Sequence, residues 1–463
     1  MEEALPVFEA EAFAAWVSGA PQALPPSFCG VTQDSRKLTP GCLYVALRGE
    51  RFDGHDFVGQ ALGAGAAAAL VEDAWRAPAE AAGWPLIRVR DTLRALGDAA
   101  RAWRCRSAAQ IVGLTGSSGK TTTKEMAAAL FGAGGKVCAT RGNLNNEVGL
   151  PLSLLRLPRD AAFGIFEVGS NHPGEIARLA DILRPRLAII SSIGCAHIEH
   201  FGSVEAITQE KGALLGALPP DGAALLCKET VGFEALSRLA SARVVTTSLQ
   251  TRDADFSGEL LEPLCGTLRV SERAAGLQTV LRSGLPGQHN ASNLLLAFAA
   301  ARTAGVPPQE AAQALRRLAL PGMRWEVVER GGATFVNDAY NANPQSMVAV
   351  LRTFVLLPCR GRRIAVLGDM LELGSQGPAL HREVGRCVAE LSPDLLVAVG
   401  ADTLRYVAGE AVKAGLPAAR VMAFGDAAAA AAAVNEFVRP GDCVLLKASR
   451  GMRLERILDN VQV

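Results

Sequence analysis

One stretch of the chain, GLTGSSGKTTTKEM, restricts the possible folds more than any other. It begins within the apolar run QIVGLT and continues into TTKEMAAALF, which has the composition of a helix. A loop between a buried strand and a helix N-terminus binds phosphate groups through converging backbone N–H groups, a lysine and a hydroxyl that holds Mg²⁺. Gly116, Gly119, Lys120 and Thr121 supply these parts. The alternative is a glycine-rich turn with no ligand.

The predicted nucleotide site takes in the whole turn after the strand. Its residues are Thr115, Gly116, Ser117, Ser118, Gly119, Lys120, Thr121 and Thr122. Leu114 stands where the standard pattern has glycine, and we expect it at the strand end, with the turn built slightly differently. Because the same loop serves kinases, switches, motors and ligases, nucleotide binding alone does not identify a function.

Short apolar runs that alternate with helical stretches predict an α/β fold with parallel sheets. The first series is QIVGLTG, KVCAT, FGIFEVG, RLAIISSIG, AALLC and RVVTTSL, and a second series, from RRIAVLGDM to DCVLLKASR, begins after Pro321-Gly322. A chain of 463 residues is too long for one core. We predict three domains: a small mixed α/β domain (1–89), a central P-loop domain with a parallel sheet (90–321) and a Rossmann-like domain (322–463).

The composition excludes several classes of protein. With 49% hydrophobic residues and a net charge of +1, the chain offers no electrostatic basis for nucleic-acid binding. Ten singly scattered cysteines favour reduced thiols, and the acidic start MEEALPVFEAEAF lacks the basic region of a signal peptide. The alanine-rich runs 61–71 and 427–434 are too short to span a bilayer and are expected to be helices. We therefore expect a cytoplasmic chain with no membrane insertion.

Polar residues near the ends of three candidate strands suggest a metal site beside the phosphates. Ligands of an open parallel sheet bind at the carboxyl ends of its strands. Thr121, Glu167 in FGIFEVGSNHPGEI and His197 in LAIISSIGCAHIEHFGS would meet there, in an environment suited to Mg²⁺. Each has an ordinary alternative, which is a strand-end salt bridge for Glu167 and a hydrogen-bonded core position for His197.

The remaining motifs resemble those of the Mur ligases, in the same order along the chain. They are TGSSGKTTTKE, RGNLNNEVGLPLSLL, EVGSNHPGEI, IGCAHIEHFGS, LPGQHNASN, PGMRWE, VNDAYNANPQSM, VLGDMLELG and LLKASRGMRLE. DSRKLTPGCLYVALRGERFDGHDF resembles the uridine-nucleotide domain of that family, so the resemblance covers nearly the entire chain. The phosphate loop marks only the broader superfamily, which includes folylpolyglutamate synthetase. NDAYNANP and GNLNNEVGLPLSLL resemble the member that adds a D-alanyl-D-alanine dipeptide.

The resemblance implies an ATP-dependent amide ligase of peptidoglycan precursor synthesis. Such an enzyme joins D-alanyl-D-alanine to UDP-N-acetylmuramoyl tripeptide through an acyl phosphate and forms the UDP-linked pentapeptide. ATP and two Mg²⁺ ions would be bound, the partners would be these small molecules, and the expected state is a monomer. The first domain would bind the UDP substrate, the central one ATP, and the third would contribute to ATP and dipeptide binding.

The resemblance also implies roles for individual residues. The catalytic residues would be Lys120, His197, Lys211 and Arg324. One Mg²⁺ would lie on Thr121 and Glu167, and the second on His197 and Lys211, the latter carrying a carbamate. The nucleotide would further contact Asn290, Asn293, Arg324 and Asp338. The other substrates would contact Ser35, Arg36, Asn143, Asn145, Asn146, Tyr340 and Asn341.

Read without the resemblance, several of these residues have simpler explanations. Asn290 and Asn293 could cap a helix start, Arg324 could be a surface arginine, and the asparagines at 143–146 and 338–343 could belong to turns. Ala448 stands where relatives often have glycine, which leaves the role of the preceding lysine open. Two other functions also remain possible: a phosphotransferase with a stable phosphorylated product, and a nucleotide-gated binding protein.

Overall fold

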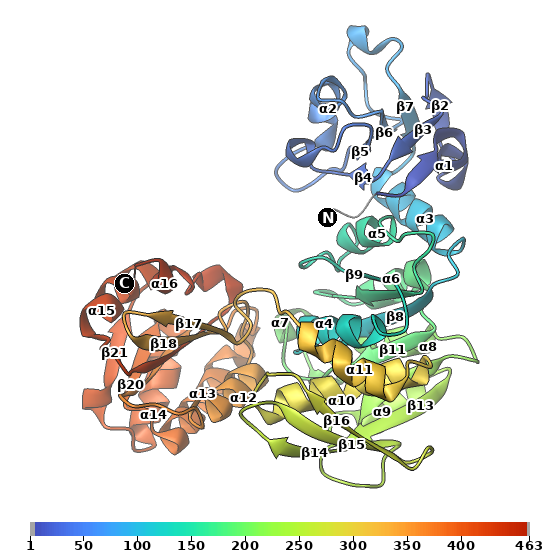
Figure 1. Ribbon diagram of the computed structural model, residues 1–463. Helices are drawn as coiled ribbons and strands as arrows, with labels where there is room; N and C mark the ends of the chain where they lie inside the picture. The colour runs from blue at the N-terminus through green and yellow to red at the C-terminus, as the bar shows by residue number, and fades with distance from the viewer. Residues whose placement is uncertain (1–4, 461–463) are drawn as a thin grey trace.

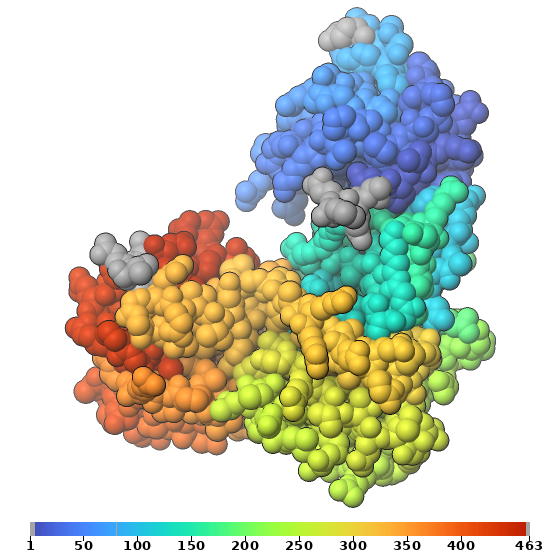
Figure 2. Space-filling view, in the orientation of Figure 1, coloured from blue at the N-terminus to red at the C-terminus, as the bar shows by residue number. Residues whose placement is uncertain are grey.

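The computed structural model describes residues 5–460 and shows three lobes, each built around its own β-sheet (Figure 1). The central lobe carries the other two, and an open notch separates the amino-terminal from the carboxy-terminal lobe (Figure 2). The α/β fold with three domains that the sequence predicts is confirmed.

The amino-terminal lobe has a five-stranded sheet in the order β2-β7-β6-β5-β4, beside a separate two-stranded ribbon of β1 and β3. The sheet is parallel except for β2. The strands are β1 (Val7–Glu9), β2 (Ala20–Gln22), β3 (Ser27–Cys29), β4 (Val31–Thr32), β5 (Leu43–Val45), β6 (Ala68–Glu72) and β7 (Leu86–Val89). α3 (Thr92–Arg104) leads from this lobe into the central one, and Asp91 caps its N-terminus.

The alanine-rich run 61–71 does not form the helix that was predicted from the sequence. α2 (Val58–Gly63) ends within the run and the buried strand β6 follows. Gly65 adopts a φ of 99° between them, a conformation that glycine reaches easily and that ends a helix. The second run forms α15 (Ala427–Phe437) as predicted.

The central lobe contains a nine-stranded sheet in the order β16-β15-β14-β13-β12-β11-β8-β10-β9. Its strands are β8 (Gln110–Thr115), β9 (Val137–Ala139), β10 (Phe163–Glu167), β11 (Leu187–Ile190), β12 (Ala223–Cys227), β13 (Arg243–Ser248), β14 (Phe256–Glu262), β15 (Thr267–Glu272) and β16 (Leu277–Arg282). β8 to β13 are parallel, so their carboxyl ends lie at one edge. α4 (Lys120–Phe131) and α10 (Gln288–Thr303) pack on one face of this sheet, and α6 (Glu175–Leu183) and α8 (Val204–Gly216) on the other.

The strands β14 to β16 form an antiparallel extension that the sequence analysis did not anticipate. Their half-exposed residues lack the continuous apolar runs by which the buried parallel strands are recognised.

The carboxy-terminal lobe has a six-stranded sheet in the order β17-β18-β22-β19-β20-β21. Its strands are β17 (Glu326–Arg330), β18 (Ala333–Asn337), β19 (Arg363–Gly368), β20 (Leu395–Val399), β21 (Val421–Phe424) and β22 (Cys443–Lys447). Only β17 is antiparallel to its neighbour. α12 (Pro344–Phe354) and α13 (Gly377–Leu391) pack together in this lobe. Between residues 5 and 460, no helix has both the length and the apolar character needed to cross a bilayer.

Candidate active site

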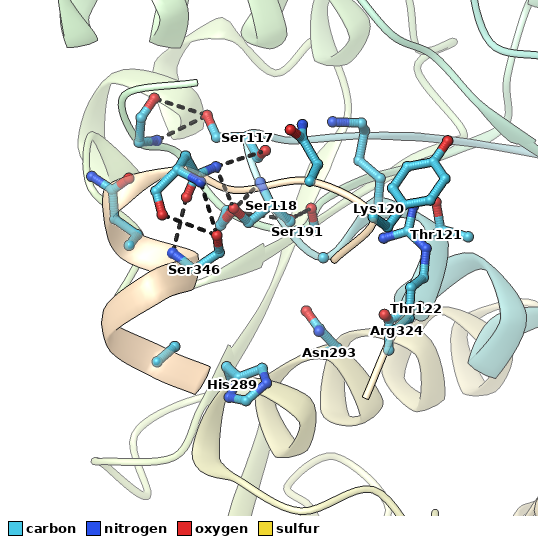
Figure 3. Close-up of a pocket in the computed structure, with 18 of the residues that line it drawn as sticks. Ser117, Ser118, Lys120, Thr121, Thr122, Ser191, His289, Asn293, Arg324 and Ser346 are labelled. Carbon is cyan, nitrogen blue, oxygen red and sulfur yellow. Dashed lines mark hydrogen bonds between the residues drawn. The ribbon is translucent and has the colours of Figure 1, made fainter. Parts of the chain in front are cut away.

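A cavity of about 630 Å³ lies where the carboxyl ends of the central strands face the carboxy-terminal lobe (Figure 3). Both lobes supply its walls. The predicted site residues that line it are Ser117, Ser118, Gly119, Lys120, Thr121, Thr122, Asn143, Asn145, Asn146, Glu167, His197, Asn290, Asn293, Arg324, Asp338, Tyr340 and Asn341. The fold therefore gathers into one place residues that are more than 200 positions apart in the sequence.

Five predicted residues are not part of this lining. Thr115 and Gly116 are buried at the end of β8 and the start of the loop, and Lys211 is buried in α8. Ser35 and Arg36 lie on the amino-terminal lobe, where the Arg36 guanidinium donates to both oxygens of Asp34.

The phosphate loop depends on glycine at two positions. Gly116 and Gly119 have φ values of 153° and 79°. A Cβ atom at Gly116 would lie 2.1 Å from Ser191 Oγ, and one at Gly119 would lie 2.7 Å from Asn293 Oδ1. Leu114 is instead a fully buried residue within β8, paired with strands on both sides, so the missing glycine affects the strand core and not the turn.

Hydroxyl groups from the next strand end hold the loop in shape. Ser191 Oγ and Ser192 Oγ donate to the Ser118 carbonyl at 2.6 and 3.0 Å, and the Ser118 N–H donates to Ser192 Oγ at 2.9 Å. Ser117 Oγ donates to the Gly194 carbonyl at 3.0 Å. The loop is thus preorganised by side chains, and its helix α4 starts at Lys120 with the positive end of the helix dipole toward the cavity.

Three cations lie close to one another around this loop. Burial lowers the pKa of Lys120, and the nearby Arg324 lowers it further while Glu167 opposes the shift. Burial also lowers the pKa of Lys211 to about 7, with Lys120 adding to the shift and Glu210 and Glu175 opposing it. Cations whose pKa values are lowered by burial and by one another are stabilised in their charged form by a polyanion such as a triphosphate.

Glu167 offers a carboxylate oxygen in the cavity that fits a metal ion. Its side chain is buried, Oε2 accepts a 3.4 Å hydrogen bond from Asn145, and Oε1 has no protein hydrogen-bond partner. A buried carboxylate oxygen without a partner is costly, and Mg²⁺ next to Thr121 would satisfy it. Across residues 5–460 no three His, Cys, Asp or Glu side chains converge as a metal site, so an ion here would also need oxygen ligands from a substrate or water.

His197 connects the two lobes that form the cavity. It adopts a left-handed φ of 58° before α7 (Ile198–Phe201), and its Nδ1 pairs with the Glu372 carboxylate of the carboxy-terminal lobe. That hydrogen bond is the main reason why the pKa of Glu372 is lowered. Glu372 was not predicted from the sequence, because a glutamate in VLGDMLELG carries no signal of a partner 175 residues away.

The first turn of α10 forms the wall opposite the loop. Asn290 donates to the Pro286 carbonyl at 2.8 Å, and the Asn293 side chain lies against Gly119. His289, which the sequence analysis missed, lines the same wall (Figure 3), and desolvation lowers its pKa to about 4. Its position next to Asn290 in GQHNASN is the sequence feature that could have indicated a place in the site.

The segment after β18 supplies the remaining wall. Asp338 accepts hydrogen bonds from Lys447 Nζ at 2.5 Å and from the Trp325 N–H at 2.8 Å. The Arg324 guanidinium lies over the Tyr340 ring, 4.0 Å from its centroid. Asn343, also missed from sequence, donates from its amide to Ser118 Oγ at 2.7 Å.

Comparison with known proteins places this site in a family. Three family models match the chain: the Mur ligase family catalytic domain over residues 27–104, the Mur ligase middle domain over 114–301 and the Mur ligase glutamate ligase domain over 323–450. The chain is 36% identical to the UDP-N-acetylmuramoyl-tripeptide--D-alanyl-D-alanine ligase of Bacillus subtilis (strain 168), over 93% of each chain. It is 38% identical to the ligase of the same name from Escherichia coli (strain K12), over 80% of this chain and 81% of that one.

Solved structures agree with these sequence matches. A crystal structure of MurF from Acinetobacter baumannii superposes with a TM-score of 0.88 at 29% identity, over 99% of each chain. MurF ligase from Thermotoga maritima in complex with ADP gives 0.77 at 27% identity, over 93% of this chain and 96% of that one. From the sequence of its motifs, its three-lobed fold and these matches, the chain belongs to the Mur ligase family.

Proposed function

We propose that this ligase joins D-alanyl-D-alanine to UDP-N-acetylmuramoyl tripeptide in the cytoplasm, at the expense of ATP. The observation that carries the proposal is the cavity itself, in which a phosphate loop, a buried carboxylate and an arginine from the linker to the third lobe meet. The relatives that bear this activity in their names match almost the full chain. The ten cysteines are all free thiols, which suits a reducing compartment.

The chemistry must make a carboxylate reactive toward an amine. A terminal carboxylate oxygen of the tripeptide attacks the γ-phosphorus of ATP, the bond from phosphorus to the bridging oxygen breaks, and ADP leaves. The amine of D-alanyl-D-alanine then attacks the carbonyl carbon of the acyl phosphate, inorganic phosphate leaves, and the amine gives up a proton. Enzymes promote both steps mainly by positioning the reactants and neutralising the phosphoryl charge.

The residues of the cavity suit these requirements. Lys120 would hold the outer phosphates and Arg324 the γ-phosphate, since both cations line the cavity. Asn290 and Asn293 would contact the adenine, and Asp338 the ribose. Substrate contacts would come from Asn143, Asn145, Asn146, Tyr340 and Asn341, all in the lining.

We assign two metal sites to these donor groups. Thr121 and Glu167 would hold one Mg²⁺, and His197 with carbamylated Lys211 would hold a second. Bound Mg²⁺ would neutralise phosphate charge and polarise the phosphoryl oxygens. A lysine whose pKa is lowered to about 7 has a substantial neutral fraction near neutral pH, and only the neutral amine can take up carbon dioxide.

We assign the lobes to the three ligands as the family pattern implies. Residues 1–89 would hold the UDP end, with Ser35 and Arg36 as contacts, and 90–321 would hold ATP. Residues 322–463 would complete the ATP site and bind the dipeptide. Closure over the cavity would also keep water from the acyl phosphate.

The direct test is release of inorganic phosphate, measured with ATP, Mg²⁺, UDP-N-acetylmuramoyl tripeptide and D-alanyl-D-alanine, omitting one component at a time. The proposal expects phosphate only when all are present, together with a UDP-linked pentapeptide. Pteroyl substrates tested in parallel should give none. Phosphate release that does not depend on the dipeptide, or ligation of a folate instead, would overturn the assignment.

A further inference from the structure

Lys447 is a buried lysine in the cavity wall to which the proposed reaction assigns no role. It ends β22, is 2% exposed, and lines the cavity. Its ammonium donates to Asp338 Oδ2 at 2.5 Å, to the Asn341 carbonyl at 3.1 Å and to the Asp338 carbonyl at 3.4 Å. One ammonium therefore fixes both ends of the segment 338–341.

The second oxygen of Asp338 reaches the linker between the central and carboxy-terminal lobes. Oδ1 accepts the backbone N–H of Trp325 at 2.8 Å. Trp325 and Met323 have φ values of 49° and 62°, in the left-handed region that large side chains rarely adopt. Such a backbone persists only where its surroundings hold it, and here the Asp338 carboxylate provides part of that hold.

The other anchors of this turn come from the same neighbourhood. The Met323 N–H donates to Glu326 Oε2 at 2.8 Å, and the Met323 carbonyl accepts the N–H of Tyr340 at 3.2 Å. Tyr340 itself lies within the segment that Lys447 fixes. The strained turn and the segment 338–341 are thus joined at two points.

Arg324 lies between the two left-handed residues and projects into the cavity. Its guanidinium stacks on the Tyr340 ring at 4.0 Å, and its Nε is buried without a protein hydrogen-bond partner. Two features support this side chain: the Met323–Trp325 turn and the Tyr340 ring. Both depend on the segment 338–341, to which Lys447 donates its hydrogen bonds. A guanidinium supported on two sides, with a donor left free, is preorganised for an anion.

We propose that Lys447 is a positioning residue: through Asp338 it holds the strained Met323–Trp325 turn and the Tyr340 ring in the arrangement that aims Arg324 at the transferred phosphoryl group. The inference rests on the proposed function, since Arg324 needs a phosphate to act on. It explains why an ammonium is buried at the end of β22 and why the turn around Arg324 is left-handed on both sides.

A double-mutant cycle tests the proposal. Lys447→Met, Arg324→Ala and the double variant are assayed for kcat and for KM of ATP. Misplacing a reacting group by about 1 Å costs about 100-fold in rate, and Lys447→Met should lower kcat, measured at saturating ATP, by about that factor. The double variant should be no slower than Arg324→Ala, and Lys447→Arg should recover most of the loss because its guanidinium can still pair with Asp338.

Arg362→Met is the matched control, because it removes a cation from another buried carboxylate of the same lobe. Arg362 pairs with Asp442 at 2.6 Å, just before the start of β22, far along the strand from Lys447. The Arg362→Met variant should have a lower melting temperature, while its kcat stays near the wild-type value. If Lys447→Met also loses its melting transition, Lys447→Gln, a shorter polar side chain without the charge, replaces it in the cycle.

The outcomes distinguish a failure of the Lys447 positioning role from a failure of the proposed ligase function. An Arg324→Ala variant with unchanged kcat would refute the proposed role of Arg324, and the positioning role with it. A slow Arg324→Ala variant that becomes slower still when Lys447→Met is added would overturn the positioning role alone. A loss of the same size in Arg362→Met would also overturn it, since general weakening of the lobe would then suffice.

Discussion

The side-chain amide of Asn343 donates a 2.7 Å hydrogen bond to the hydroxyl of Ser118, so the carboxy-terminal lobe touches the phosphate loop directly. Asn343 also caps α12: its Oδ1 accepts the Ser346 N–H, and Ser346 Oγ accepts the Asn343 N–H. The phosphate loop and the helix α12 of the third lobe are thus connected through one side chain. The pair of His197 with Glu372 is a second connection across the same interface.

Removing the Ser118 hydroxyl should loosen this connection without disturbing α12. A neutral hydrogen bond contributes about 0.5–1.5 kcal/mol, so we expect Ser118→Ala to lower kcat about two- to tenfold and to reduce the compaction that an ATP analogue induces. Small-angle scattering with and without the analogue measures the compaction. Ser346→Ala is the control, because it breaks the capping box and leaves the interlobe bond. Unchanged compaction in Ser118→Ala would show that the contact does not report closure.

Lys211→Ala should lose nearly all ligation, because it removes the carbamate that would hold the second Mg²⁺. In the unchanged enzyme, ¹³C-bicarbonate should give a carbamate signal in the NMR spectrum that grows as the pH rises through about 7, where the amine becomes neutral. The variant should lack that signal. If Lys211→Ala turned over at nearly the wild-type rate, this buried lysine would be structural.

Arg324→Ala should impair catalysis more than nucleotide binding. The loop and Lys120 remain to bind ADP, whereas the charge that builds up on the transferred phosphoryl group loses its partner. We expect kcat to fall by about 10³-fold, toward the range found for arginines that act on a transferred phosphoryl group. Calorimetry of ADP binding gives the comparison, and equal losses of kcat and affinity would contradict a role in the transition state.

His289 should make the protein sensitive to mild acid. Desolvation lowers its pKa to about 4, and Lys447 adds to the shift while Asp338 opposes it. The pKa of an unfolded histidine is about 6.5, so between these values the unfolded chain binds a proton that the folded chain does not. This contribution to stability is full above about pH 6.5 and is lost as the pH falls toward 4.

His289→Gln should remove that part of the acid sensitivity. Urea unfolding of both proteins at about pH 7 and about pH 5 gives the two free energies of unfolding at each pH. The difference between variant and unchanged protein should move in favour of the variant at the lower pH. A difference that is the same at both values would show that His289 is not buried in its neutral form.

Sequence alone was sufficient for the parts of the site that lie within one motif. The phosphate loop and Glu167 could be found because local spacing places them after strands, whereas the first turn of α10 was assigned to the site only through the resemblance to the Mur ligases. Leu114 looked like a defect and is a core residue, because the loop's glycine requirement falls on Gly116 and Gly119.

Contacts between lobes could not be predicted from the sequence. Glu372 and Asn343 acquire their partners only when β19, α12 and the central sheet have been placed in three dimensions. The same holds for the antiparallel strands β14 to β16, whose mixed polar pattern resembles loops, and for the strand at Ala68–Glu72, where alanine suggests helix and burial selects a strand.

The most direct test of the central claim is to follow the oxygen atoms of the tripeptide carboxylate. With ¹⁸O in that carboxylate, a reaction through an acyl phosphate must pass one labelled oxygen to inorganic phosphate for each UDP-linked pentapeptide formed. Mass spectrometry of the released phosphate measures this. One ¹⁸O per phosphate, dependent on D-alanyl-D-alanine, is the predicted result, and unlabelled phosphate formed at the same rate as pentapeptide would contradict the account.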